Sequence, residues 1–169
     1  MYALRSSPED RDNAMFHLGI TGALLFALSL DAGASGTAPV VRAISLERDC
    51  NGCPSGTRLT LHADGRAQLE TLGKERLGTA SQLREGRLPT REFMALARLA
   101  RSRSGVLSLA ENQADPQEQD GPWLTLRIEY SDGQARQVFS RGAQPPALAK
   151  MVSAIDAAGH RIVFNTPPE

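Results

Sequence analysis

Residues 57–72, TRLTLHADGRAQLETL, decide the fold of this chain. The first six alternate between polar and apolar, which is typical of a strand with one buried face. The apolar face holds Leu59 and Leu61. The opposite face carries polar residues: Arg58, Thr60 and His62. Asp64-Gly65 then favours a tight hairpin turn, because glycine adopts the positive φ that such turns need. The stretch therefore predicts a β-hairpin whose second strand is Arg66–Leu72.

A second hairpin is predicted closer to the C-terminus. Trp123–Tyr130 alternates, Ser131-Asp132-Gly133 supplies a turn, and Ala135–Ser140 is the expected partner strand. One face of the first of these strands is apolar along its length: Leu124, Leu126, Ile128 and Tyr130. That face is expected to join the apolar face of the first hairpin in one core.

The segments around the hairpins are shorter and more polar. Val40–Glu47 is predicted as a first strand and His160–Asn165 as a short final strand. We interpret Lys74–Thr79 as an edge strand and Gln82–Arg87 as a polar connection. Glu111–Asp120 is expected to be an acidic surface loop.

Two amphipathic helices are expected. The first begins with Thr90 as its N-cap and ends at Gly105. Its apolar residues have helical spacing: Phe93, Leu96, Ala97 and Ala100. The second begins at Pro145-Pro146 and is capped by Gly159. Its apolar stripe consists of Leu148, Val152 and Ile155.

These elements predict an α+β fold: an antiparallel sheet built from two β-hairpins, with two α-helices packed on one face. The opposite face of the sheet is expected to meet water through polar residues: Arg58, Thr60, Arg127 and Glu129. A single domain should span residues 40–165, with a linker at 35–39 before it and a tail at 166–169 after it.

An apolar segment near the N-terminus indicates the compartment. Leu18–Leu30, LGITGALLFALSL, is uncharged, and Ala32-Gly33-Ala34 follows at the spacing that signal peptidase recognises. We therefore expect residues 1–34 to be a signal peptide that is cleaved near Ala34, with Met15 as an alternative start of translation. The rival interpretations are a membrane anchor, for which the segment is short, and a buried helix of a cytosolic domain.

The expected mature chain, residues 35–169, would reside in the periplasm or be secreted. It carries 17 basic and 15 acidic residues, a net charge of +2. So weak a field argues against nucleic acid as a partner. Contact with the membrane is expected only transiently, through the signal segment.

Cys50 and Cys53 are the only cysteines and form a C-x-x-C motif. An exported protein meets oxidising conditions, which favours a structural disulfide. A redox-active pair is the first alternative, although such a pair usually precedes a helix and here a strand follows. A metal site is the second alternative, with His62 and His160 as the further ligands.

The remaining candidate residues indicate binding rather than chemistry. Trp123 is interpreted as a lid on the core or as a ligand platform. Arg91, Arg98 and Arg101 share the outer face of the first helix, and Asp120 ends the acidic loop. We find no catalytic motif of the phosphate-binding, serine-nucleophile or zinc-protease type. No catalytic residue and no cofactor is therefore predicted.

The order of these features resembles a small bacterial envelope family, the domain of unknown function numbered 6438. The resemblance rests on the strand at Ile44–Leu46, on Cys53-Pro54, on the two Asp-Gly turns and on the helix PALAKMVSAID at 146–156. It spans most of Val41–Phe164. In that family the cysteines usually stand one residue further apart and a tyrosine follows the Cys-Pro pair, where this chain has Ser55. The resemblance implies a similar fold and an envelope location, and it implies no particular activity.

The functional hypothesis is an exported, non-enzymatic domain that binds an unknown protein partner in the cell envelope. Its concrete form is an inhibitor or an immunity-type protein of an envelope enzyme. The alternative is a thiol-redox or metal-binding protein that uses Cys50 and Cys53.

Overall fold

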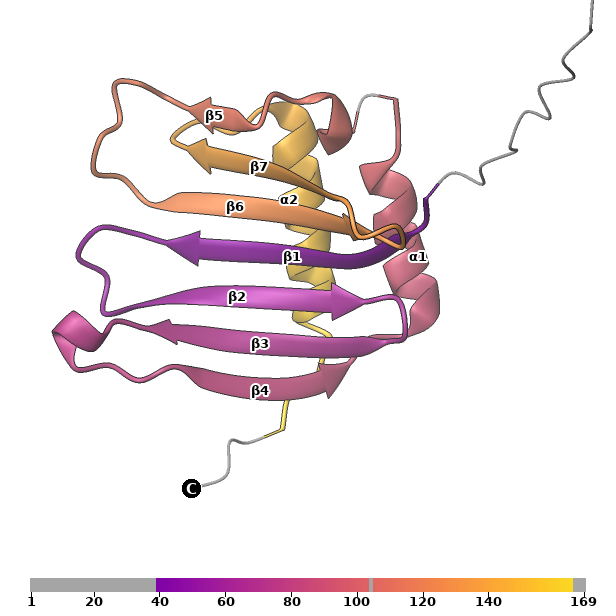
Figure 1. Ribbon diagram of the computed structural model, residues 1–169, viewed down its shortest axis with the longest axis horizontal. Coiled ribbons are helices and arrows are strands. Elements are labelled where there is room, and N and C mark those ends of the chain that lie inside the picture. Colours follow the sequence, from indigo (N-terminus) through magenta and orange to yellow (C-terminus); the bar gives the residue numbers. More distant parts are fainter. Residues whose placement is uncertain (1–38, 104, 166–169) are drawn as a thin grey trace, which may run out of the picture. The chain divides into compact units, whose positions relative to one another are not determined.

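A seven-stranded sheet with two helices on one face makes up the part of the chain that the computed structural model describes, residues 39–103 and 105–165 (Figure 1). The strands are β1 Val41–Asp49, β2 Ser55–His62, β3 Arg66–Gly73, β4 Gln82–Arg87, β5 Asn112–Ala114, β6 Trp123–Tyr130 and β7 Ala135–Arg141. The helices are α1 Thr90–Ala100 and α2 Pro146–Gly159, and two 3₁₀ turns are η1 Glu75–Leu77 and η2 Val106–Ser108. The predicted signal peptide and the tail lie outside the described residues.

The strand order is β4-β3-β2-β1-β6-β7-β5. Both predicted hairpins are present, as β2–β3 and β6–β7. β1 lies between them and pairs antiparallel with each, so that Ile44 stands opposite Leu61 on one side and Ile128 on the other. The α+β class is confirmed, but the sheet has seven strands rather than two hairpins. It is also mixed rather than purely antiparallel, because β5 pairs parallel to β7.

The β3–β4 region differs from the prediction. Lys74–Thr79 is not a strand, because the Thr79 hydroxyl accepts a hydrogen bond from the Lys74 N–H at 2.7 Å and Gly78 adopts a φ of 69°, which closes a turn. Gln82–Arg87, predicted as a connection, is the edge strand β4. Gly86 is needed there because a Cβ atom would lie 2.5 Å from Ile162 Cγ2.

Two short segments also differ from the prediction. Part of the acidic loop forms the three-residue strand β5. Two backbone hydrogen bonds to β7 lie at its ends: the Phe139 N–H donates to the Glu111 carbonyl at 2.7 Å, and the Asp115 N–H donates to the Arg141 carbonyl at 3.0 Å. Residues 160–165 do not form a strand. They run along the helix-covered side of β4, where Ile162 lies beside Gly86, and the Asn165 N–H then donates to the Glu85 carbonyl at 2.8 Å.

The helices begin close to their predicted starts and bury the predicted faces. All four stripe residues of α1 are buried, as are the three predicted for α2. Pro89 rather than Thr90 occupies the N-cap of α1, and the helix ends at Ala100, before Gly105. Gly159 is the last residue of α2 and His160 takes the C-cap position.

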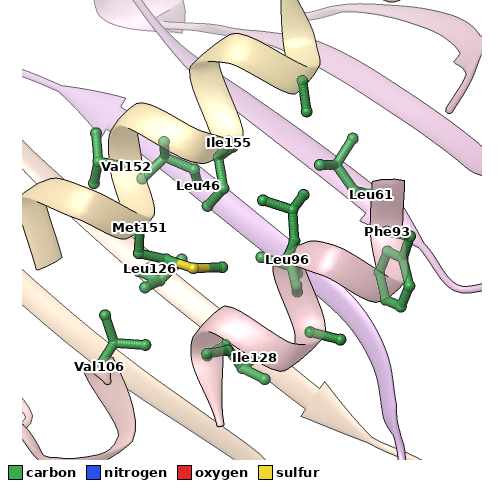
Figure 2. Packing of buried hydrophobic residues seen from close by; sticks show 14 of the residues in the cluster. Leu46, Leu61, Phe93, Leu96, Val106, Leu126, Ile128, Met151, Val152 and Ile155 are labelled. Carbon is green, nitrogen blue, oxygen red and sulfur yellow. The ribbon is translucent and has the colours of Figure 1, made fainter. Parts of the chain in front are cut away.

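The core lies between the sheet and the two helices. Figure 2 shows Leu46, Leu61 and Leu126 of the sheet gathered with side chains from both helices: Phe93, Leu96, Met151 and Ile155. Each of these seven side chains is at most 5% exposed. Neither of the two described helices lies on the opposite face of the sheet (Figure 1). That face is polar at the predicted positions Arg58, Thr60, Arg127 and Glu129.

Candidate binding site at the disulfide end of the sheet

The predicted disulfide between Cys50 and Cys53 is present, with the two Cα atoms 5.4 Å apart. It closes the loop that joins β1 to β2. Gly52 has a φ of 86° in this loop, a conformation that residues with a Cβ rarely adopt. The loops β1–β2, β3–β4 and β5–β6 lie at the same end of the sheet, which we call the disulfide end (Figure 1).

A largely buried ion pair holds the disulfide loop in place. The Lys74 ammonium donates to Asp49 Oδ1 and to the Cys50 carbonyl, both at 2.7 Å. The Cys50 N–H also donates to Asp49 Oδ1 at 2.7 Å. Burial acts to raise the pKa of Asp49, but the hydrogen bonds from Lys74 and Cys50 and the charges of Lys74 and Arg76 outweigh it, so the pKa is lowered. The carboxylate therefore stays ionised and fixes the loop backbone.

A pocket of about 520 Å³ opens at the disulfide end, where β1 and β7 end and β6 begins. We call it the Trp123 pocket. Its volume lies within the usual range for small-ligand sites. Its lining combines apolar, charged and amide groups: Arg48, Asp49, Glu118, Pro122, Trp123, Leu124, Ser140, Gly142, Ala143 and Gln144.

Trp123 belongs to the lining of the pocket. It is the first residue of β6, stands opposite Asp49 of β1 and Arg141 of β7, and is only partly buried. The Arg141 guanidinium carbon lies 5.5 Å from the centre of the Trp123 ring, within the range of a cation–π contact. Trp123 lies outside the hydrophobic cluster that Leu124, its neighbour in the sequence, joins.

Ser140 is the most deeply buried polar residue of the pocket lining. Its side chain is 1% exposed, and its hydroxyl has no hydrogen-bond partner among the described residues. A buried hydroxyl without a partner costs free energy. The sequence contained the signal for this residue, because Val138 and Ser140 both fall on the inward face of β7 and a serine at a core position is unusual.

The Glu118 side chain lies close to Gly121 and Gly142 and belongs to the lining of the same pocket. A Cβ atom at Gly142 would lie 3.0 Å from the carboxyl carbon of Glu118, and one at Gly121 would lie 3.0 Å from its Oε2. Sequence reasoning placed Glu118 in an acidic loop and did not connect it, Arg48 or Ser140 with Trp123. Only the pairing of β1, β6 and β7 brings these residues together.

The other predicted binding residues separate into two groups. Asp120 lies at the disulfide end, where its Oδ1 accepts a hydrogen bond from Asn51 Nδ2 at 3.4 Å, but it does not line the pocket. The predicted arginines lie elsewhere: Arg91 and Arg98 are exposed on α1, and Arg101 is the exposed C-cap residue of that helix. Arg101 donates to the Pro39 carbonyl.

The four residues of the alternative metal site are not brought together. Cys50 and Cys53 are joined in the disulfide before β2 begins, whereas His62 is the last residue of that strand. An eight-residue strand is on the order of 25 Å long. His62 Nε2 lies 3.3 Å from Gln68 Oε1, and His160 follows α2 and lies with Leu46 and Leu59 on the helix-covered side. Within residues 39–103 and 105–165, no three metal-ligating side chains gather.

Comparison of the chain with models of known protein families, and with curated proteins, finds no match. The resemblance to domain family 6438 therefore stays a prediction. In the described part of the chain, neither helix has both the length and the hydropathy that a membrane span requires.

Proposed function

We propose that the chain is an exported, non-enzymatic binding domain that uses the Trp123 pocket to engage a protein in the cell envelope. Its concrete role would be that of an inhibitor or an immunity-type protein of an envelope enzyme. The observation that carries this proposal is the pocket itself, whose lining includes Trp123 and the buried Ser140 with its unpartnered hydroxyl.

Two features of the chain support export. The apolar segment 18–30 followed by Ala32-Gly33-Ala34 is typical of a secretory signal. The Cys50–Cys53 disulfide suits an oxidising compartment, since such bonds are rare in the cytosol.

Protein binding is supported by the way the disulfide end is built. The ion pair of Lys74 with Asp49 and the hydrogen bond from the Thr79 hydroxyl to the Pro54 carbonyl (2.6 Å) tie neighbouring loops together. Loops that are already ordered lose little entropy when a partner binds. Tryptophan and arginine are also the residues that contribute most to the affinity of protein interfaces.

Binding rather than catalysis is supported by the composition of the pocket. Ser140 is the one hydroxyl in its described lining, and no histidine lies beside it to act as a general base. The acidic residues of the lining are Asp49, which is engaged by Lys74, and the exposed Glu118.

Affinity capture from envelope extract tests the proposal. The tagged full chain should retain one partner in stoichiometric amount. Ala143→Arg, which places a long charged side chain in the pocket, should lose that partner. Ala135→Arg is the matched control, because it makes the same change on an exposed residue at the other end of β7. Absence of a stoichiometric partner, or equal capture by both variants, would count against the proposal.

A further inference from the structure

The disulfide loop contains a reactive pair of residues that the proposed function does not use. Asn51 is followed directly by Gly52 between the two cysteines, and both residues are exposed. The amide carbon of an asparagine side chain can be attacked by the backbone nitrogen of the next residue. A glycine in that next position leaves the nitrogen unshielded, because glycine has no Cβ atom. Asn51-Gly52 is the only Asn-Gly pair in the sequence.

The Gly52 nitrogen is accessible and is not engaged within the described chain. The pairing of β1 with β2 stops at Arg48 and Thr57, before the loop. Neither the Gly52 N–H nor the Cys53 N–H donates to a backbone carbonyl of the residues that the structure describes, so the turn lacks the hydrogen bond that often closes four residues. A Cβ atom placed on Gly52 would meet nothing within 4 Å beyond its two neighbours in the chain. The loop therefore leaves open space at the reacting nitrogen.

The Asn51 side chain is held by a single long contact. Its Nδ2 donates to Asp120 Oδ1 at 3.4 Å on the exposed surface, which is longer than a typical hydrogen bond. Asn112 differs in each respect and serves as an internal reference. Its Oδ1 accepts from the Ala114 N–H at 2.9 Å, its backbone lies in strand β5, and Gln113 follows it in place of a glycine.

We propose that Asn51 is a site of covalent modification by water, in which spontaneous deamidation places a negative charge on the disulfide loop. The Gly52 nitrogen attacks Asn51 Cγ and closes a five-membered succinimide ring. The Cγ–Nδ2 bond breaks, and Nδ2 leaves as ammonia with the proton of the Gly52 N–H. One water molecule then opens the ring. Cleavage of the new N–Cγ bond gives aspartate, and cleavage of the original peptide bond gives isoaspartate.

Either product changes the contact between the disulfide loop and the β5–β6 loop. A carboxylate at position 51 has no N–H to donate, so the hydrogen bond to Asp120 is lost and two like charges face each other. Isoaspartate also lengthens the main chain between Cys50 and Cys53 by one carbon atom. The modification needs no partner, and it does not depend on the proposed function.

Ageing of the purified, oxidised protein at mildly alkaline pH tests the assignment. Samples taken over time are reduced, alkylated and digested with trypsin, and a sample digested without ageing gives the background. The peptide 49–58 holds Asn51 as its only asparagine. It should gain the mass difference between an amide and a carboxylic acid at least an order of magnitude faster than the peptide that contains Asn112. The rate should rise with pH, because the attacking nitrogen must lose its proton.

Gly52→Ala should slow the conversion of Asn51 by about an order of magnitude, because the added methyl group shields the nitrogen. Gly133→Ala is the matched control. It makes the same change at another exposed glycine, whose φ of 83° is close to the 86° of Gly52 and whose surroundings are equally open. The control should leave the rate at Asn51 unchanged. Conversion of Asn51 no faster than that of Asn112, or equal rates in Gly52→Ala and the unaltered protein, would overturn the inference.

The loss of the loop contact has its own measurement. Asn51→Asp reproduces one product, and the double variant Asn51→Asp/Asp120→Asn exchanges donor and acceptor and so restores the hydrogen bond. Urea denaturation should give a lower midpoint for the single variant than for the double variant. Equal midpoints would overturn the predicted effect on the contact with the β5–β6 loop.

Discussion

At the scale of single residues, the pairing of Asp49 with Lys74 is the contact on which the disulfide end depends. Their side chains are only 16% and 14% exposed, and their atoms meet at 2.7 Å. The same lysine also holds the Cys50 carbonyl. One side chain thus satisfies a carboxylate and a loop carbonyl together, and its loss would leave both without this donor.

Lys74→Met should lower the free energy of unfolding by about 1–3 kcal/mol, because the Asp49 carboxylate would be left largely buried without its charged partner. Urea denaturation measures the change. Lys150→Met is the control, since Lys150 is the only other lysine and is exposed on α2. Equal stability of the two variants would show that the pair contributes nothing.

The same carboxylate predicts a pH dependence. Because the pKa of Asp49 is lowered below its ordinary value of 3.8, its contribution to stability is fully present above pH 3.8. The contribution is lost as the pH falls through the lower value of the folded state. The difference in unfolding free energy between the unaltered protein and Asp49→Asn should therefore shrink between pH 5 and pH 2. A difference that stays constant over this range would contradict the lowered pKa.

At the scale of elements, the disulfide loop shows which predictions the sequence allowed. The alternation at 57–62 identified a strand after the Cys-Pro pair, and β2 does begin at Ser55. The strand β4 was missed because the only larger apolar residue of Gln82–Arg87 is Leu83, which is exposed. The core side of β4 is covered at Gly86 by Ile162, which lies far along the chain. β5 was missed for the same reason: three polar or small residues carry no periodic signal.

Reduction of the disulfide should leave the fold intact. The bond closes a loop of only four residues, for which chain entropy accounts for about 2 kcal/mol or less. In guanidinium denaturation, the oxidised and the reduced protein should each show one cooperative transition, and the two midpoints should differ modestly. Cooperative unfolding that disappears in reductant would contradict this estimate.

The reduced thiols should also react slowly, which separates the proposed function from the thiol-redox alternative. A low thiol pKa is typical of a cysteine at a helix N-terminus, and here strand β2 follows the pair. Alkylation of Cys50 by iodoacetamide at pH 7 should be no faster than that of a cysteine in an unfolded peptide. A rate tenfold or more above the peptide value would favour redox chemistry.

At the scale of the whole described domain, the two edge strands of the sheet are protected from pairing with another chain in different ways. β5 is only three residues long, which limits the backbone it offers to another chain. On the other side, residues 162–165 cover β4 at Gly86 and Glu85. The sequence could predict the two hairpins and both helices, but not these edges or the central position of β1. They depend on pairing between residues far apart in the chain.

Gly86→Thr should expose the β4 edge, since a Cβ atom there would meet Ile162 and the Val163 carbonyl at 2.5 and 2.9 Å. We expect self-association, measured by light scattering against protein concentration. Glu85→Thr is the control, because it introduces the same residue on the adjacent, opposite-facing position of β4. A monodisperse Gly86→Thr protein would show that the C-terminal segment does not protect the edge.

The central place of β1 has a kinetic consequence. Ile44 of the first strand faces Ile128, so the middle of the sheet joins residues more than 80 positions apart. Contacts of such long range slow folding, because a large loop must close before the pairing is gained. The two halves of the sheet cannot join until β6 has been synthesised. The fold therefore stays incomplete through most of the synthesis of the chain, a property that would suit passage through a membrane channel in the unfolded state.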